Sequence, residues 1–252
     1  NYFQWLLTRF STPEELFGVL SLKELELGVY KRNTTGKLPE AHFAFLDEIF
    51  KSNSAILNSL LTLINERLFY NNGSPFKSPL MSIVGSSNEY PEDGEGLEAL
   101  FDRFLLRFEV EYIKDESNFI RMLKGGVNHQ VPSMTLDEMM QHQFLADMVF
   151  IPDNVFSVLA DIRRYLQDEG VRPSDRRFKQ SLSLLKAKAY IEGRQEVSPS
   201  DIMLLKNALW ETVDQKHVTV QIVTENAQDK VTLLLKQRQK EVLELVELGK
   251  SD

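Results

Sequence analysis

The spacing of apolar and polar positions divides the 252-residue chain into a mixed first part and a helical second part. Residues 43–46 are four consecutive apolar residues, which predicts a short strand covered on both faces, as in a parallel sheet. Residues 54–67 place apolar side chains at the i, i+3, i+4 spacing of a helix with one buried face. Residues 80–85 form a second apolar strand. This alternation predicts an α/β fold with a parallel sheet.

The segments around these strands carry weaker patterns. The first 45 residues are predicted to be irregular, apart from a short helix that begins at residues 11–13. Two hairpins are predicted, at residues 29–39 and 69–77, because turn-forming residues separate bulky ones. Further elements are expected in three places: helices at residues 97–106 and 115–123, and a strand at residues 108–112. Gly125 and Gly126 are predicted to end the first domain.

The pattern after about Leu136 is helical throughout. Residues 152–166, 174–192 and 198–210 each predict an amphipathic helix, and Ser198 is a strong start signal for the last. Residues 218–248 predict one long helix, interpreted as a strut or a packing arm for a neighbouring domain. The predicted domains are a partial α/β core (residues 1–126), a helical domain (135–212) and a helical C-terminal extension (213–252).

The composition excludes several classes of protein. The net charge is −8, from 29 Lys and Arg against 37 Asp and Glu, which argues against a protein that mainly coats nucleic acid. No cysteine is present, so thiol catalysis and thiolate metal sites are excluded, and a reducing, cytoplasmic location is expected. The four histidines lack zinc-ligand spacing. No apolar run reaches the roughly 18 residues of a membrane span, and no signal peptide is visible.

Two acidic residues, Asp47 and Glu48, end the first predicted strand, and Asn88 follows the second. In an open parallel sheet, ligands bind beyond the carboxyl ends of the strands. A magnesium–nucleotide site needs one carboxylate near the ion and a second group that orients the attacking water. Asn88 can donate to a phosphate and also bond a water. The alternative interpretations are that Asp47 and Glu48 are exposed acids at a strand end and that Asn88 is a turn residue.

Arg103 follows Asp102 near the end of a predicted helix. A guanidinium there can stabilise charge on a transferred phosphate. Taken alone, the residues favour the alternative, an ion pair within the chain with Asp102 or Glu98.

Arg176 and Arg177 open a helix in the second part. They belong to a stretch, residues 163–194, with nine Lys or Arg against four Asp or Glu. This local excess of positive charge can neutralise a polyphosphate in a cleft between domains. An ordinary solvated helix face is the equal alternative.

The order of these features resembles the AAA+ ATPases, and among them the MoxR group, which carries a helix-interrupting hairpin before the Walker B strand and a second hairpin before sensor 1. Three segments resemble the RavA branch closely: LFGVLSLKEL (residues 16–25), GKLPEAHFAFLDEIFKSNSAILNSLLTLINERLF (36–69) and SSNEYPEDGEGLEALFDRFLLRF (86–108). With SDRR at residues 174–177, the resemblance covers roughly residues 10–210. It implies an AAA+ core, a parallel sheet with helices and inserted hairpins, followed by an all-α lid.

The resemblance also implies roles for the residues that match the family's motifs. Asp47 matches the Walker B acid associated with magnesium, Glu48 the acid that polarises water, and Asn88 sensor 1. The implied cofactors are ATP and Mg²⁺.

The arginines match the parts of the family that complete a site in a ring. Arg103 matches the arginine finger offered to the neighbouring subunit, with Arg107 as the less favoured candidate. Arg176 matches sensor 2, the lid arginine that reaches the γ-phosphate, with Arg177 as the fallback. The implied partners are further copies of the chain in a hexameric ring and a von Willebrand A-domain protein.

One part of the family pattern is absent. The Walker A loop, G-x-x-x-x-G-K-[ST], does not occur before the first hairpin. A near miss at residues 249–251 is rejected, because Glu244 occupies its first glycine position and no helix can follow. We therefore expect the first strand and the loop in a segment upstream of Asn1, and no ATP hydrolysis by this chain alone.

The leading hypothesis is an oligomeric ATPase that remodels or assembles a protein partner. The second is a catalytically silent scaffold or binding module with a degenerate ATPase fold, which the intact Asp47, Glu48, Asn88, Arg103 and Arg176 argue against. A DNA-translocating motor is disfavoured by the acidic balance and by the lack of a basic, aromatic hairpin.

Overall fold

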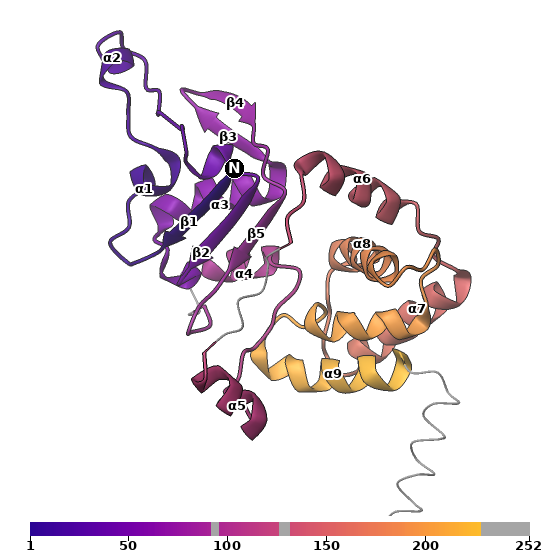
Figure 1. Cartoon of the computed structure of the whole chain (residues 1–252). Coiled ribbons are helices and arrows are strands. Elements are labelled where there is room, and N and C mark those ends of the chain that lie inside the picture. The colour runs from indigo at the N-terminus through magenta and orange to yellow at the C-terminus, as the bar shows by residue number, and fades with distance from the viewer. Residues whose placement is uncertain (92–95, 126–131, 228–252) are drawn as a thin grey trace, which may run out of the picture. The chain divides into compact units, whose positions relative to one another are not determined.

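The computed structural model of the protein describes residues 1–91, 96–125 and 132–227. Contacts divide the chain into two compact units, Asn1–Phe104 (the α/β unit) and a second that begins at Leu105 (the helical unit; Figure 1). This division comes earlier than the boundary predicted at Gly125 and Gly126, because Leu105 and Leu106 pack against the core of the helical unit. Gly126 itself lies outside the described residues.

A parallel sheet of three strands forms the centre of the α/β unit. The strands are β1 (Tyr2–Leu6), β2 (Phe43–Asp47) and β5 (Ser82–Gly85), in the order β1-β2-β5. The strands predicted at residues 43–46 and 80–85 and the parallel sheet are therefore confirmed. The prediction that the first 45 residues are irregular was wrong for β1, whose partner β2 lies about 40 residues later in the chain. Local spacing in so short a segment does not reveal such a partner.

Helices cover one face of this sheet. On that face Phe3, Ala44 and Leu46 are buried together with side chains of α3 (Ser54–Glu66) and α4 (Leu97–Arg103; Figure 1). Asn53 begins α3 by accepting hydrogen bonds from two amides of its first turn.

The opposite face is only partly covered by the residues that the structure describes. Tyr2, Leu6 and Val84 are 64%, 56% and 56% exposed there, and Phe43 and Phe45 are half-buried. The prediction that residues 43–46 are covered on both faces was therefore wrong for the described chain. Parallel sheets normally bury both faces, so this surface is unusual.

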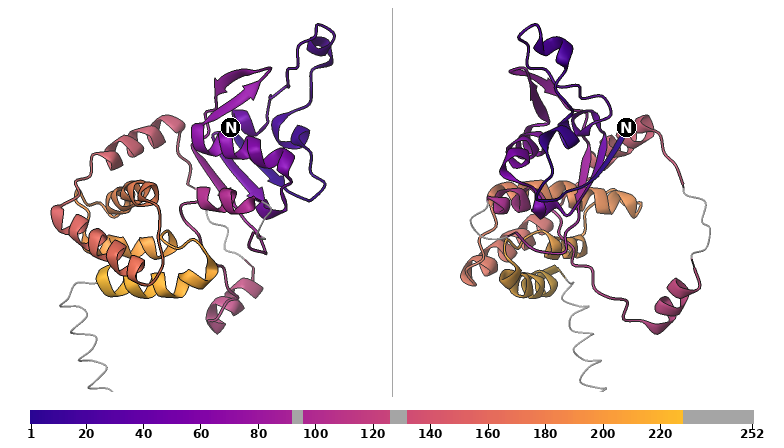
Figure 2. Two further views of the ribbon diagram at one scale, coloured as in Figure 1. Left: turned by 180° about the vertical axis from the view of Figure 1, so that it is seen from behind. Right: turned by 90° about the vertical axis from the view of Figure 1, so that its left-hand side faces the viewer.

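Two insertions project from the unit side by side (Figures 1 and 2). The hairpin predicted at residues 69–77 is confirmed as β3 (Leu68–Asn71) and β4 (Ser74–Lys77), joined by Asn72 and Gly73 in left-handed conformations. The hairpin predicted at residues 29–39 was wrong. Residues 31–33 instead pair with residues 19–21, on either side of the short helix α2 (Leu22–Leu25), through two backbone hydrogen bonds of 2.8 Å.

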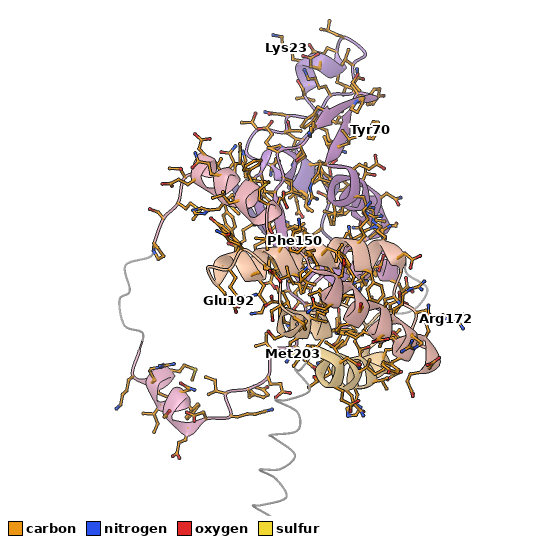
Figure 3. All side chains as sticks on the ribbon, turned by 90° about the vertical axis from the view of Figure 1, so that its right-hand side faces the viewer. Lys23, Tyr70, Phe150, Arg172, Glu192 and Met203 are labelled. Atoms are coloured by element: carbon orange, nitrogen blue, oxygen red, sulfur yellow. The ribbon has the colours of Figure 1, made fainter. Side chains whose placement is uncertain are left out.

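Asn71 joins the two insertions. Its side-chain oxygen accepts from the Arg32 amide at 2.7 Å, and its side-chain nitrogen donates to the Arg32 carbonyl at 2.9 Å. Figure 3 shows Lys23 and Tyr70 at this projecting end of the α/β unit.

The shorter helices of the α/β unit are α1 (Pro13–Phe17), η1 (Leu38–Glu40) and η2 (Ile49–Lys51). The short helix predicted to begin at residues 11–13 is confirmed as α1.

The helical unit has one hydrophobic core, to which most of its helices contribute. Its helices are α5 (Glu116–Leu123), α6 (Leu136–Asp147), α7 (Asp153–Asp168), α8 (Asp175–Ile191), η3 (Pro199–Asn207) and α9 (Val213–Ala227). The helices predicted at residues 115–123, 152–166 and 174–192 are confirmed. The one predicted at residues 198–210 is a 3₁₀-helix, still capped by Ser198. The predicted helix at residues 218–248 is seen as far as Ala227, and its remainder, like residues 249–251, lies outside the described residues.

The strand predicted at residues 108–112 was wrong. Phe108, Val110 and Tyr112 are 65%, 93% and 99% exposed, and the segment has no strand partner among the described residues. An alternating pattern forms a strand only where another strand edge is available for hydrogen bonding.

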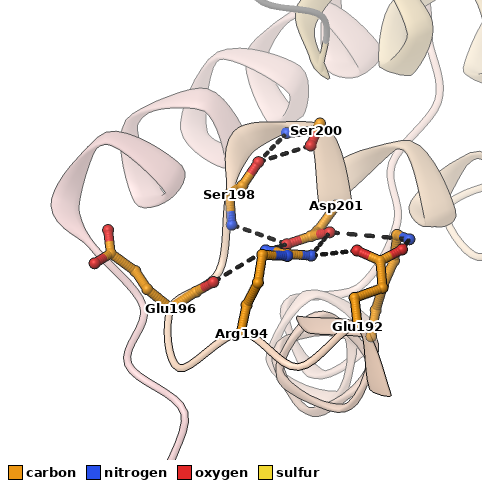
Figure 4. A network of polar contacts seen from close by, with 7 residues as sticks. Glu192, Arg194, Glu196, Ser198, Ser200 and Asp201 are labelled. Carbon is orange, nitrogen blue, oxygen red and sulfur yellow. Dashed lines mark hydrogen bonds and ion pairs between the residues drawn. The ribbon is translucent and has the colours of Figure 1, made fainter. Parts of the chain in front are cut away.

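An ion pair with a buried carboxylate closes the loop between α8 and η3 (Figure 4). Asp201, which is 1% exposed, accepts from two nitrogens of Arg194 at 2.8 and 2.6 Å and from the Ser198 amide at 2.8 Å. Glu192 accepts a further bond from Arg194 at 2.6 Å. The two carboxylates raise the pKa of the Arg194 guanidinium above its ordinary value.

Candidate nucleotide and magnesium site

The carboxyl ends of β2 and β5 bring Asp47 next to Ser86. The register pairs Leu46 with Gly85, so the next residue of each strand lies opposite the other. The Ser86 hydroxyl donates to Asp47 Oδ1 at 2.5 Å, and the Glu48 amide donates to the same oxygen at 3.1 Å. The Asp47 carboxylate is therefore fixed through one of its two oxygens.

Glu48 leaves the strand conformation at once. Its φ and ψ of 53° and 46° are left-handed, an unfavourable region for a residue with a side chain. The Ile49 amide donates to the Ser86 carbonyl at 2.9 Å, which ties this turn to the neighbouring strand. The turn separates the two acidic side chains, so each has its own hydrogen-bond partners.

Asn88 contacts the Glu48 carboxylate. Its side-chain nitrogen donates to Glu48 Oε1 at 2.7 Å, across 40 positions of sequence. The Lys51 ammonium lies 3.3 Å from the other oxygen, Oε2. The structure therefore brings together three of the predicted site residues, Asp47, Glu48 and Asn88, at one edge of the sheet.

The donor set at this edge suits a magnesium ion that keeps most of its ligands as water or phosphate. Both hydrogen bonds of Asp47 use Oδ1, which leaves Oδ2 able to face an ion. No group of three or more His, Asp or Glu side chains that could hold a metal occurs in the described part of the chain. Mg²⁺ is commonly bound by one or two carboxylates together with substrate phosphates, and Asp47 meets that requirement.

The candidate finger arginines are engaged within their own units. Arg103 ends α4 and pairs with Asp102 at 2.8 Å, the intrachain contact that the residues alone favoured. Arg107 is buried: it donates to the Trp210 carbonyl, and its guanidinium lies 5.3 Å from the Trp210 ring centre. Arg107 therefore has a packing role, which makes Arg103 the better candidate of the two.

The two lid arginines have different surroundings. Arg177 is 2% exposed and donates to the carbonyls of Ala208 at 2.8 Å and Leu105 at 3.4 Å. Arg176, the preceding residue at the start of α8, is exposed. Arg177, the second candidate for sensor 2, therefore has a structural role, whereas Arg176 is accessible to a ligand.

Sequence reasoning gave no role to two residues that contact the acids, Ser86 and Lys51. A hydroxyl directly after an apolar strand, beside an aspartate that follows the neighbouring strand, was a usable signal for Ser86. Lys51 stands three positions after Glu48, but only the left-handed turn at Glu48 brings the two side chains together.

Comparisons with known proteins identify the family of each part of the chain. Residues 1–149 match the family described as the MoxR domain in the MoxR-vWA-beta-propeller ternary systems, and residues 154–223 match the AAA lid domain. The uncharacterised proteins MJ0079 and MJ0812 of Methanocaldococcus jannaschii are 40% and 42% identical over 225 and 229 residues, 88% of this chain in each case. The chain spans only 59% and 60% of the length of these relatives.

A solved structure shares the fold. The crystal structure of a Cytophaga hutchinsonii protein assigned as an ATPase superposes with a TM-score of 0.67 at 18% identity, covering 89% of this chain and 76% of that one. Among the described residues, no helix is both long enough and apolar enough to span a membrane.

Proposed function

Because this chain belongs to the MoxR group of AAA+ ATPases, we propose that it is the core and lid of a RavA-like motor subunit, which hydrolyses ATP with Mg²⁺ to remodel or assemble a protein partner. The observation that carries the proposal is the edge where β2 and β5 end. There Asp47 is fixed by Ser86, and Glu48 is bonded to Asn88 at 2.7 Å.

In the proposed reaction a water oxygen attacks the γ-phosphorus of ATP, the bond to the β–γ bridging oxygen breaks, and ADP leaves. Mg²⁺ supplies neutralisation of the phosphate charge. Asp47 would hold the ion or its waters. Glu48 accepts the proton that the water loses, and Asn88 orients the water and a phosphate oxygen.

The arginines complete the site. Arg103 serves as the finger toward a neighbouring copy in a ring, which we take to be a hexamer, and doing so requires it to exchange Asp102 for a phosphate. Arg176 reaches the γ-phosphate from the lid. The accessibility of Arg176 beside the buried Arg177 supports this assignment.

The phosphate-binding loop belongs, in this proposal, to a segment that precedes Asn1. Two features of the α/β unit support such a segment. β5 pairs with β2 alone among the described residues, so its other edge can accept a further strand. The sheet face that carries Tyr2, Leu6 and Val84 can be covered by a further helix. This chain alone should therefore not hydrolyse ATP.

The partner we propose is a von Willebrand A-domain protein, which the description of the matching family supports. A cytoplasmic location is part of the same proposal, based on the absence of cysteine.

The test is ATP turnover by the full-length protein beside Glu48→Gln, which keeps the size and the Asn88 contact but removes the base. Loss of the base should lower kcat by about 100-fold or more. Equal rates would remove Glu48 from the mechanism. Absence of turnover in the wild-type protein, despite an intact upstream loop, would favour the silent scaffold.

A further inference from the structure

We infer that Lys51 is a positioning residue for Glu48: its ammonium group holds one carboxylate oxygen, so that the other is turned toward Asn88 and the attacking water. This inference rests on the proposed function, because it assigns Glu48 the role of base. In this inference Lys51 acts only through Glu48 and does not contact the nucleotide or the water.

The backbone explains why these two side chains meet. Glu48 precedes η2, in which the Lys51 amide donates to the Glu48 carbonyl at 2.9 Å. Glu48 is the left-handed residue directly before this 3₁₀ helix, and Lys51 is its last residue. The short turn keeps the two residues close, and the Lys51 ammonium lies 3.3 Å from the carboxylate.

The surroundings of the Glu48 carboxylate show what Lys51 contributes. The side chain is 13% exposed, and Oε2 is buried without a hydrogen bond, whereas Oε1 has the Asn88 amide. A buried carboxylate oxygen that lacks a donor is costly unless a positive charge lies close by. The Lys51 ammonium, 3.3 Å away, is the charge that meets this requirement.

We expect the two contacts to respond differently to a bound nucleotide. Asn88 follows β5, a different strand, and its amide also has to serve the water and a phosphate oxygen. Lys51 belongs to the same turn as Glu48 and therefore moves with it. When Asn88 turns to the ligand, Lys51 still holds Oε2, and the vacated Oε1 stays directed at the water.

The activity arm of the test uses the full-length protein with Lys51→Met, Lys51→Arg and the control Lys124→Met, an exposed lysine at the end of α5. Lys51→Met should lower kcat about tenfold with a KM for ATP within twofold of the wild type, since base positioning is lost and nucleotide binding is not. Lys51→Arg, which keeps the charge, should restore most of the rate. The control should match the wild type.

The second arm measures how much the Lys51–Glu48 ion pair contributes to thermal stability in the absence of nucleotide. In this chain, Lys51→Met should lower the thermal midpoint of the α/β unit by about 2–5 °C, but leave it nearly unchanged in a Glu48→Gln background.

The two arms separate the inference from the proposed function. Wild-type turnover that Glu48→Gln abolishes, with an unchanged or raised kcat in Lys51→Met, would overturn the inference alone. So would equal midpoint shifts in the two backgrounds. A wild-type protein without turnover would overturn both.

Discussion

Replacing Asp201 by alanine removes the acceptor that holds the loop between α8 and η3 (Figure 4). The carboxylate is 1% exposed and takes two hydrogen bonds from Arg194 and one from the Ser198 amide. This loop joins the end of α8 to the start of η3. The substitution therefore measures how much this ion pair contributes to the free energy of unfolding of the helical unit.

The expected loss follows from these contacts. Hydrogen bonds to charged groups contribute about 1.5–3 kcal/mol each, and loss of a cap costs about 1 kcal/mol. Arg194 is 33% exposed, so water and Glu192 can solvate it once Asp201 is gone. The net loss for Asp201→Ala should be about 2–3 kcal/mol. Arg194→Ala should cost more, about 3–5 kcal/mol, because it leaves a buried carboxylate whose remaining cation, Lys188, is 4.0 Å away.

Urea unfolding followed by Trp210 fluorescence measures this loss. The chain has two tryptophans, and Trp210 is 2% exposed within the helical unit, so a Trp5→Phe background makes the signal specific. With a slope of about 2 kcal/mol/M, a loss of 3 kcal/mol lowers the midpoint by about 1.5 M. The matched control is Asp161→Ala, which removes an exposed pair with Arg164 in the same unit and should change little.

The double variant refines the test. Asp201→Ala together with Arg194→Ala should be about as stable as Asp201→Ala alone, since the guanidinium has lost its main partner. Two results would refute the reasoning that the buried carboxylate determines the stability loss. One is an unfolding midpoint for Asp201→Ala within about 0.3 M of the wild type. The other is a smaller loss of stability for Arg194→Ala than for Asp201→Ala.

Two further predictions concern the lid arginines and an ion pair of the α/β unit. Arg177→Ala should lower the unfolding midpoint of the helical unit by leaving two carbonyls without their donor, at about 1–3 kcal/mol. Arg176→Ala should leave that midpoint unchanged and reduce ATP turnover of the full-length protein; the opposite assignment would make Arg177 the ligand contact. The Arg32 guanidinium, which donates to Glu14 at 2.9 Å, lowers the pKa of Glu14 below its ordinary value of 4.5. An ionised Glu14 with a lowered pKa stabilises the fold above the unfolded pKa of 4.5, and this stabilisation is lost as the pH falls through the folded pKa. Glu14→Gln should therefore destabilise the α/β unit at pH 7, and the difference from the wild type should shrink as the pH falls below 4.5. A difference in urea midpoints that stays constant over this range would contradict the prediction.

Local patterns in the sequence predicted many of the helices, strands and turns of this protein. The apolar run before Asp47 predicted β2, and the helical spacing that followed predicted α3. Asn72 and Gly73 predicted the turn of one insertion. These features could be predicted because each depends on neighbours within a few positions: caps, turn conformations and the period of a buried stripe.

The tertiary structure alone decided which distant residues meet. It made residues 2–6 a strand, paired residues 19–21 with residues 31–33, and placed Arg177 inside while Arg176 stayed outside. The sequence predicted that Asp47, Glu48 and Asn88 lie at one edge of the sheet. Their hydrogen-bond and ion-pair partners depended on the register of β2 with β5 and on the left-handed backbone of Glu48. Contacts that span about 40 positions, such as Asn71 with Arg32, arise only when distant segments pair, and no local pattern identified that pairing.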